Sequence, residues 1–261
     1  MNSLLADKYE ALCAIIAKKG KVALAFSGGV DSTLLLKASM EATGGKVIAL
    51  LAVTPLQPES ETSDAINTAN IIGASLQIRN LDPLTWPDFV KNPPDRCYLC
   101  KKAIYTDFKQ YLFHQPDTIL MDGTNLDDLQ EDRPGRRAIN ELEVATPLVE
   151  AQLGKDEIRA LSKALQLATW NKPSASCLAT RIATGESINS DKLFIIARCE
   201  RYLHDLGVKN CRVRLVRENH AFIELMSCDF NKLLGQEIRK QVQVFFKSMG
   251  FLKVFLDLSE R

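Results

Sequence analysis

Apolar and polar positions along the first two thirds of the chain predict strands that alternate with helices. Residues 22–26 form a short apolar run, and residues 47–53 form a second run that contains no polar residue. A continuous apolar run of this length is typical of a strand buried on both faces. Helical segments follow, one with apolar periodicity over residues 33–38 and one from about Glu59 to Ile72, which Gly73 is expected to end.

The alternation continues to about residue 170 and indicates a parallel sheet. Further strands are predicted at residues 76–78 and 118–121, with a helix after Cys100 and an amphipathic helix at residues 156–165. Alternating strands and helices form a doubly wound sheet whose ligands bind at the carboxyl ends of the strands. The predicted fold class is therefore α/β, with a doubly wound parallel sheet in residues 1–170.

The pattern changes after residue 170 and predicts a second, smaller domain. Residues 171–185 are polar and bounded by proline, and we interpret them as a linker that carries Cys177. Residues 186–261 predict a small α+β domain. Its expected helices span about 190–206 and 231–248, and its expected strands span 212–216, 221–225 and 251–258.

Composition narrows the class of protein. The chain has 261 residues, 46% hydrophobic and 25% charged, which is ordinary for a globular protein with one large or two small cores. No apolar run reaches the length of a membrane span, and residues 1–7 do not resemble a signal peptide. A net charge of +1 argues against a surface that coats nucleic acid. Seven cysteines without a secretion signal favour a reducing cytoplasm, where thiols carry out chemistry.

The string Ser27-Gly28-Gly29-Val30-Asp31-Ser32 joins the first predicted strand to the helix after it. Its two glycines allow backbone N–H groups to approach an anion closely, and the start of the helix adds unpaired donors and a positive dipole end. The serines add hydroxyl groups, and Asp31 can either cap the helix or face a magnesium ion. The string predicts a turn that holds phosphate, and the alternative is a capped Gly-rich turn without a ligand.

The loop is neither a Walker loop, which would need Gly-Lys-Ser/Thr, nor a G-x-G-x-x-G dinucleotide loop. It resembles the PP-loop of the ATP pyrophosphatase superfamily. Members activate a carbonyl or carboxylate with AMP, release pyrophosphate, and let a nitrogen or sulfur nucleophile displace the AMP. The resemblance implies ATP and Mg²⁺ as cofactors and a catalytic role for Asp31. The implied ATP-binding residues are Ser27, Gly28, Gly29, Val30, Asp31, Ser32, Asp122 and Gly123.

Cys97 and Cys100 form a C-x-x-C pair at a predicted helix start, where the helix end and adjacent lysines favour thiolates. The pair alone is compatible with zinc, a redox couple or an iron–sulfur cluster. Cys177, in a polar segment, is a third candidate. Three cysteines are one short of a fully protein-ligated [4Fe–4S] cluster, and the remaining iron can bind a sulfide. We interpret the other cysteines as packing residues: Cys13, Cys199, Cys211 and Cys228.

Together these motifs resemble the LarE family of ATP-dependent sulfurtransferases over almost the whole chain. The strings that carry the resemblance are SGGVDS at 27–32, CYLCKK at 97–102, DGTN at 122–125, DRPG at 132–135, CLATR at 177–181, RVR at 212–214 and LDL at 256–258. Family members adenylate a carboxylate of pyridinium-3,5-biscarboxylic acid mononucleotide and let sulfur displace AMP. The thiocarboxylate product serves the nickel-pincer cofactor of lactate racemase.

The resemblance also assigns roles to individual residues. One branch of the family sacrifices a single cysteine at the position of Cys177, and a second carries three cysteines and a [4Fe–4S] cluster. Cys97 and Cys100 beside Cys177 place the chain in the cluster branch, with catalytic Cys177 and a sulfide whose source the sequence does not give.

Arg212 and Arg214 are two apart on a predicted strand, so their side chains leave the same face. The resemblance implies that they bind the substrate phosphate, with Thr180 and Arg181 helping to hold the substrate and Glu200 binding a metal near a subunit interface. Without the resemblance, the alternative for the two arginines is a solvated edge strand, and the alternative for Glu200 is an exposed position on a helix. The resemblance further implies a homo-oligomer, a hexamer.

The chain departs from the family pattern at residues 183–185, which read Ala-Thr-Gly where Pro-Tyr-Gly is common, and Arg261 stands where a Gly-containing tail is expected. Three other functions fit parts of the pattern. A PP-loop tRNA thiolase would need a basic surface. An amide-forming PP-loop synthetase would use ammonia as the nucleophile and would not need three cysteines. A nucleotide- or metal-sensing module would bind ATP without releasing pyrophosphate.

Overall fold

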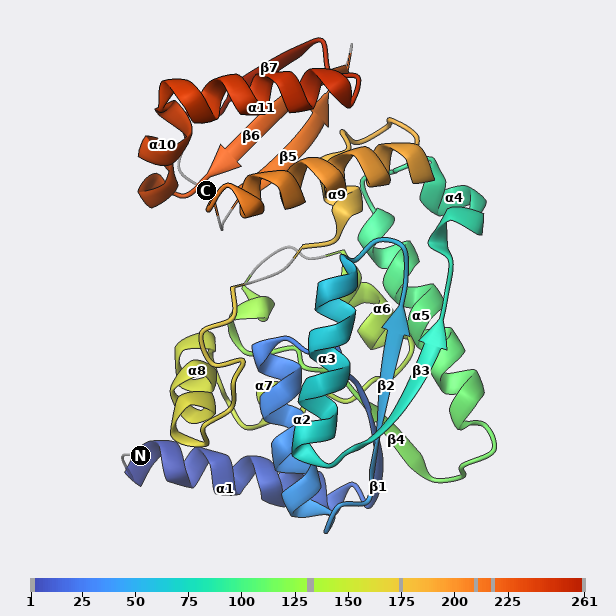
Figure 1. The fold of residues 1–261 in the computed structure, drawn as a ribbon. Helices are drawn as coiled ribbons and strands as arrows, with labels where there is room; N and C mark the ends of the chain where they lie inside the picture. The colour runs from blue at the N-terminus through green and yellow to red at the C-terminus, as the bar shows by residue number, and fades with distance from the viewer. Residues whose placement is uncertain (1–2, 131–133, 174–175, 209–210, 217–218, 260–261) are drawn as a thin grey trace. The chain divides into compact units, whose positions relative to one another are not determined.

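The computed structural model describes residues 3–130, 134–173, 176–208, 211–216 and 219–259 (Figure 1). The chain forms two compact units: Met1–Asp82 with Asp95–Ala175, and Pro83–Pro94 with Ser176–Arg261. The second unit therefore includes a segment between the third and fourth strands of the first, which the sequence analysis had assigned to the first domain. None of the helices in the described ranges has the length and apolar character needed to cross a membrane.

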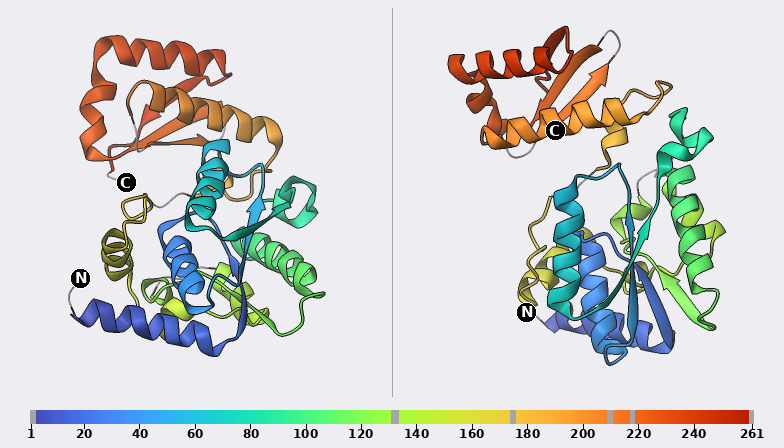
Figure 2. Two further views of the ribbon diagram at one scale, coloured as in Figure 1. Left: turned by 60° about the horizontal axis from the view of Figure 1, so that its bottom comes forward. Right: turned by 45° about the vertical axis from the view of Figure 1, so that its right-hand side comes forward.

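A four-stranded parallel sheet forms the centre of the first unit, in the order β3-β2-β1-β4 (Figures 1 and 2). The strands are β1 Lys21–Ala25, β2 Val47–Val53, β3 Ser75–Asn80 and β4 Thr118–Met121. All four predicted strands are confirmed, and β2 has the predicted bounds. The helices are α1 Ser3–Lys18, α2 Val30–Ala42, α3 Glu59–Ile72, α5 Arg96–Leu112, α6 Gly135–Glu141, α7 Pro147–Glu150 and α8 Lys155–Ala164, with a 3₁₀ turn η2 at Asp127–Leu129.

Helices cover both faces of this sheet, because successive side chains of a strand point to opposite faces. Val22 and Leu24 of β1 lie in one hydrophobic core with residues of α1, α2, α3 and α8. Ala23, between them, lies in a second core with Tyr105 and Phe108 of α5. The predicted α/β class with a doubly wound parallel sheet is confirmed.

The second unit contains a three-stranded mixed sheet in the order β5-β6-β7, in which β6 is antiparallel to β5 and parallel to β7. Its strands are β5 Cys211–Val216, β6 His220–Leu225 and β7 Lys253–Leu256, and its helices are α9 Ser190–Asp205, α10 Ser227–Leu234 and α11 Gln236–Ser248. The prediction of one helix over 231–248 is wrong. Gly235 separates α10 from α11 with an extended backbone (φ −57°, ψ 134°), as suits a residue that disfavours helix.

Residues 83–94 belong to this unit through backbone and side-chain hydrogen bonds. The segment contains a 3₁₀ turn η1 Pro83–Thr85 and the short helix α4 Pro87–Val90. Asn92 is fully buried, and its Nδ2 donates to the carbonyl of Ala183 at 2.8 Å, while its own carbonyl accepts from the Gly185 N–H at 2.8 Å. The Ile188 N–H donates to the carbonyl of Val90 at 2.9 Å. These bonds connect the segment to the chain that follows Cys177.

Candidate active site

The strand order creates a crevice at the carboxyl ends of β1 and β4. From β1 the chain moves to β2 on one side and later returns to β4 on the other side, which makes this edge a topological switch point. A cavity of about 560 Å³ opens there. Its lining residues are Ala25, Ser27, Asp31, Ser32, Cys97, Lys101, Tyr105, Asp122, Gly123, Thr124, Asp128, Pro134, Gly135 and Arg136.

The loop Ser27–Ser32 follows β1 and leads into α2, as predicted. Gly28 has φ +70°, and a Cβ placed on it would lie 2.6 Å from the Cβ of Ala65 on α3, so only glycine fits. Gly29 is the N-cap of α2 and brings no side chain to the helix start. The backbone N–H groups of the first turn therefore form a potential anion site. The Val30 side chain is buried in the core, so its contribution to a ligand is limited to its backbone.

Hydroxyl groups hold the shape of the loop. The Oγ atoms of Ser27 and Ser32 lie 3.1 Å apart, and the Ser32 hydroxyl donates to the carbonyl of Gly29 at 3.2 Å. The Gly29 N–H donates weakly to Ser27 Oγ at 3.4 Å. Ser32 is buried while Ser27 is exposed, so the side chain of Ser27 is less restricted at the cavity than that of Ser32.

Asp31 does not cap α2; it forms an ion pair with Lys155, whose Nζ lies 2.6 Å from Asp31 Oδ2. Asn125 Nδ2 donates to the other carboxylate oxygen at 3.3 Å. Lys155 begins α8 and is 124 residues from Asp31 in the chain. The sequence analysis missed Lys155, because nothing local to it indicates a partner so distant.

Asp122 follows β4 and is almost fully buried, as 7% of it is exposed. It accepts hydrogen bonds from the Tyr105 hydroxyl, the Thr124 hydroxyl and, at 2.7 Å, the Thr124 N–H, and Lys101 Nζ lies 3.2 Å from it. Burial alone would raise the pKa of Asp122, but the Lys101 charge and these hydrogen bonds outweigh it and lower the pKa. Burial, followed by the charge of Asp122, raises the pKa of Tyr105 well above its usual range. Asp122 thus stays ionised and fixes the loop after β4.

Gly123 allows that loop to approach the Gly-rich loop closely. A Cβ placed on Gly123 would lie 3.1 Å from the backbone nitrogen of Ser32. The structure therefore brings the predicted ATP-binding residues after β1 and after β4 together along one cavity. The neighbouring motif residues Asp132 and Arg133 lie outside the described residues, as do Ser174 and Ala175 ahead of Cys177.

Cys97 and Cys100 lie in the first turns of α5, which confirms the prediction of a C-x-x-C at a helix start. Their spacing of three residues puts them on one side of the helix. Cys97 is exposed and lines the same cavity as the Gly-rich loop, whereas Cys100 is half-buried and does not line it. Lys101 and Tyr105, at intervals of four residues from Cys97, also line the cavity.

Cys177 is half-buried and belongs to the second unit. Within the described ranges, no group of three or more His, Cys, Asp or Glu side chains is placed to hold a metal ion. The three-cysteine cluster remains a prediction. Of the predicted packing cysteines, Cys199 and Cys211 are buried and Cys13 is half-buried, but Cys228 is exposed, so that interpretation of Cys228 is wrong.

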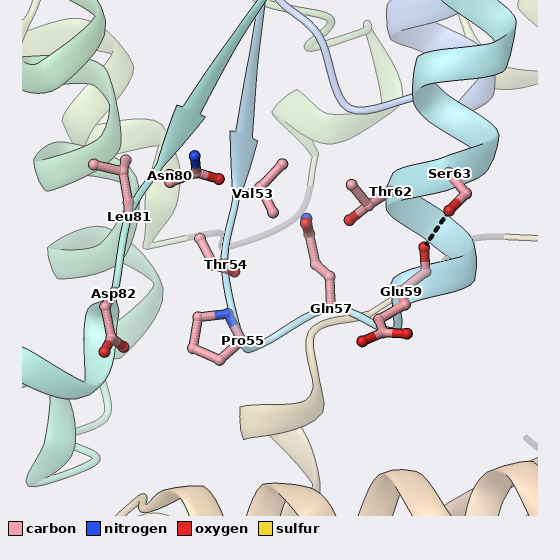
Figure 3. Close-up of a pocket in the computed structure, with 10 residues that line it drawn as sticks. All are labelled: Val53, Thr54, Pro55, Gln57, Glu59, Thr62, Ser63, Asn80, Leu81 and Asp82. Atoms are coloured by element: carbon pink, nitrogen blue, oxygen red, sulfur yellow. Dashed lines mark hydrogen bonds between the residues drawn. The ribbon is translucent and has the colours of Figure 1, made fainter.

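A second cavity, of about 710 Å³, lies at the same edge of the sheet, beyond the ends of β2 and β3 (Figure 3). Its lining residues are Val53, Thr54, Pro55, Gln57, Glu59, Thr62, Ser63, Asn80, Leu81 and Asp82. Amide, hydroxyl and carboxylate groups alternate with aliphatic ones around it, and Ser63 Oγ donates to the carbonyl of Glu59 at 3.0 Å (Figure 3). The lining offers hydrogen bonds together with apolar contact.

In the second unit, alternate residues of β5 are buried, so Arg212 and Arg214 share the other face, as predicted. Arg214 forms an ion pair with Glu224 on β6, and its Nη1 donates to the carbonyl of Thr180 at 2.8 Å. Arg181 is buried and pairs with Glu200 on α9, with Nε 2.9 Å from Oε1. Arg214, Arg181 and Glu200 thus each have a protein partner in this unit.

The fold and the first cavity define an α/β protein with a Gly-rich loop at the switch point of its sheet. No family model matches the sequence. Over 97% of its length the chain is 32% identical to the pyridinium-3,5-bisthiocarboxylic acid mononucleotide synthase of Lactiplantibacillus plantarum, of which it covers 91%. The chain therefore belongs to the LarE family.

Two uncharacterised proteins have a similar degree of likeness. One, from Synechocystis, is 34% identical over 98% of this chain and 95% of its own length. The other, from Methanocaldococcus jannaschii, is 32% identical over 92% of this chain and 90% of its own length. Both matches span the two units of the chain.

Proposed function

We propose that this protein is an ATP-dependent sulfurtransferase that converts a carboxylate of pyridinium-3,5-biscarboxylic acid mononucleotide into a thiocarboxylate. The name of the Lactiplantibacillus relative, a synthase of the bisthiocarboxylic acid mononucleotide, supports the product class. The observation that carries the proposal is a single cavity lined by the Gly-rich loop and by Cys97. A phosphate-binding loop and a thiol in one cavity suit a reaction that activates a group with ATP and then adds sulfur.

The first half of the reaction uses the loop. A carboxylate is a poor acyl donor because its oxide is a poor leaving group, and attachment to AMP supplies a better one. The N–H groups at the start of α2 would bind the departing pyrophosphate, and Lys155 would offset its charge. Asp31 and Asp128 offer carboxylate oxygens of the kind that Mg²⁺ prefers. The second cavity, at the same edge of the sheet, would take the nucleoside part of ATP.

The second half of the reaction uses the cysteines. Thiolates are the donor set that iron–sulfur clusters require, and Cys97, Cys100 and Cys177 would hold a [4Fe–4S] cluster. When bound with three protein ligands, such a cluster supplies an iron position for an additional sulfide. A carbon–sulfur bond then forms at the activated carboxylate while the carbon–oxygen bond to AMP breaks, and AMP leaves with the electron pair.

Pyrophosphate release tests the activation step. We expect ATP to yield pyrophosphate and AMP only when the pyridinium dicarboxylate mononucleotide is present, and mass spectrometry to show exchange of one oxygen for sulfur. Asp31→Asn should slow pyrophosphate release by about 10²-fold, the usual effect of removing one charge-stabilising group. Asp88→Asn is the matched control, since Asp88 is an exposed aspartate in the second unit. Full turnover of Cys177→Ala with ammonia would instead identify an amide-forming synthetase.

Metal analysis after anaerobic reconstitution tests the cluster. We expect about four irons per chain with matching acid-labile sulfide. Ala at Cys97, Cys100 or Cys177 should abolish this content. Cys228→Ala, which changes an exposed cysteine outside the proposed set, should retain it. Zinc without labile sulfide in the wild-type protein would contradict the cluster.

A further inference from the structure

We infer that Arg181 and Glu200 are positioning residues that fix the backbone around Cys177. The inference rests on the proposed function only in giving Cys177 its role in sulfur transfer. It gives both residues a role other than the ones expected from the sequence, which are substrate binding for Arg181 and metal binding for Glu200. All residues involved belong to the second unit.

The guanidinium of Arg181 contacts both Glu200 and the cysteine segment. Its Nε lies 2.9 Å from Glu200 Oε1, and its Nη2 lies 3.3 Å from Oε2. On the other edge, Nη1 donates to the carbonyl of Ser176 at 2.9 Å and to that of Cys177 at 3.1 Å. The guanidinium thus connects Glu200 on α9 with the backbone of Ser176 and Cys177.

The carbonyl of Cys177 accepts two further hydrogen bonds, both from Thr180. The Thr180 N–H donates at 3.0 Å and its hydroxyl at 2.7 Å. Arg181 Nη1 also lies 3.0 Å from Thr180 Oγ1. Three donors on one carbonyl leave the backbone of Cys177 little freedom, and the 3₁₀ turn η3 Leu178–Arg181 keeps these donors in place.

Two further hydrogen bonds connect the Arg181–Glu200 pair and the cysteine segment to β5. Glu200 Oε1 accepts the N–H of Val213 on β5 at 3.0 Å, so the carboxylate joins α9 to the sheet. Arg214, also on β5, donates to the carbonyl of Thr180 at 2.8 Å. The segment 176–181 is therefore held from a helix and from a strand.

Burial makes this arrangement rigid. The side chains of Arg181 and Glu200 are only 7% and 12% exposed, so water competes little for their hydrogen bonds. Arginine supplies a fork of donors that lysine cannot reproduce. A reacting sulfur needs its supporting residues fixed to about half an ångström. A buried Arg–Glu pair that fixes the cysteine backbone meets this need.

The test measures alkylation of Cys177 by iodoacetamide in the metal-free, full-length protein, with each cysteine followed by peptide mass spectrometry. We expect Arg181→Gln and Glu200→Gln to raise the alkylation rate of Cys177 about tenfold, because the segment opens locally. Arg181→Lys retains the charge but not the fork, so we expect it to raise the rate as well. If Arg181→Gln does not fold, Arg181→Lys decides the question.

Two controls separate local loosening from unfolding. Cys199 on α9 is fully buried, and burial raises the pKa of its thiol to about 12, so it reacts only when the unit unfolds. Arg201→Ala removes an exposed ion pair with Asp205 one residue after Glu200, and it should change no rate. Unchanged Cys177 alkylation in Arg181→Lys, or a parallel rise at Cys199 in every folded variant, would overturn the inference.

Kinetics provide the second readout. We expect Arg181→Lys to lower kcat for thiocarboxylate formation at least tenfold with KM for the mononucleotide unchanged, as for a group that acts through Cys177. A raised KM with unchanged kcat would show that Arg181 binds the substrate directly and would overturn the inference. If the wild-type protein forms no thiocarboxylate, the proposed function fails, while the alkylation rates still decide the positioning role.

Discussion

At the scale of the residue, Gly28 shows how a single position joins the Gly-rich loop to the core. Its φ of +70° and its approach to Ala65 exclude any side chain. Gly123 plays the same part from the other strand end, against the backbone of Ser32. The string SGGVDS predicted the turn, but the packing of α3 against Gly28 could not be predicted, because nothing in the string indicates which helix lies above it.

Gly28→Ala should therefore destabilise the first unit and abolish pyrophosphate release. The left-handed backbone costs about 1–2 kcal/mol for alanine, and the overlap with Ala65 adds about 1–3 kcal/mol. Urea unfolding measures the loss. Gly44→Ala is the matched control, since Gly44 has φ +60° and open space around it, so it carries only the backbone cost. Equal losses for the two variants would contradict the contact with α3.

The ionisation of Asp122 makes the stability of the fold depend on pH. Its folded-state pKa is lowered, so its ionised form stabilises the fold at pH values above about 4, the usual pKa of an aspartate, and this contribution is lost as pH falls through the lower folded-state pKa. Lys101→Gln removes the main attractive charge and leaves a buried carboxylate whose pKa rises. We expect acid unfolding of Lys101→Gln to begin at higher pH than that of the wild type. Lys109→Gln, on the same helix, should leave the midpoint unchanged.

At the scale of the element, α5 presents one stripe to the cavity. Cys97, Lys101 and Tyr105 are spaced by four residues and therefore follow one face of the helix. The first residue supplies a thiol, and the other two hold Asp122 at the end of β4. The sequence predicted the helix start at the C-x-x-C pair, but the contact of this stripe with β4 depends on the second core of the sheet.

Tyr105→Phe tests this connection between α5 and β4. The ring remains in the core, but Asp122 loses a buried donor, so we expect a loss of about 1–3 kcal/mol in the free energy of unfolding. Tyr111→Phe on the same helix is the matched control, because Tyr111 is half-buried and its ring, which Arg79 overlies, is retained. Equal effects of the two changes would show that the Tyr105 hydroxyl contributes nothing to the connection.

At the scale of the whole molecule, the second unit is discontinuous in sequence. Residues 83–94 leave the first unit between β3 and α5 and join the chain after Cys177 through Asn92. No local sequence pattern predicted that residues 83–94 would belong to the second unit. It places short helical turns from the first half of the chain in the unit that carries Cys177.

Asn92→Ala should weaken the second unit in particular. Asn92 is buried with φ 55°, and alanine would lose its side-chain bonds and tolerate this backbone poorly, a combined cost of about 2–4 kcal/mol. Hydrogen exchange should speed up in β5 and β6 while β1 and β2 stay protected. Asn219→Ala, at an exposed Asn with φ 53°, should show only the smaller backbone effect. Uniform acceleration across both sheets would contradict this assignment.

The sequence alone determined the parts that depend on neighbours in the chain. The apolar run at 47–53 and the helical segment at 59–72 have the predicted bounds, because burial pattern and helix-ending glycine are local signals. The class of the sheet followed from their alternation. The Gly-rich loop and the helix start at Cys97 were local signals as well.

Only the tertiary structure decided which side chains meet. It pairs Asp31 with Lys155 across 124 residues, brings Cys97 to the cavity of the Gly-rich loop, and joins Arg181 to Glu200. Each contact links segments that are separate in the chain, and their approach is set by strand order and by packing against a shared core. A charged side chain has the same local pattern whether it faces a ligand or a buried partner, so its partner is decided by the fold.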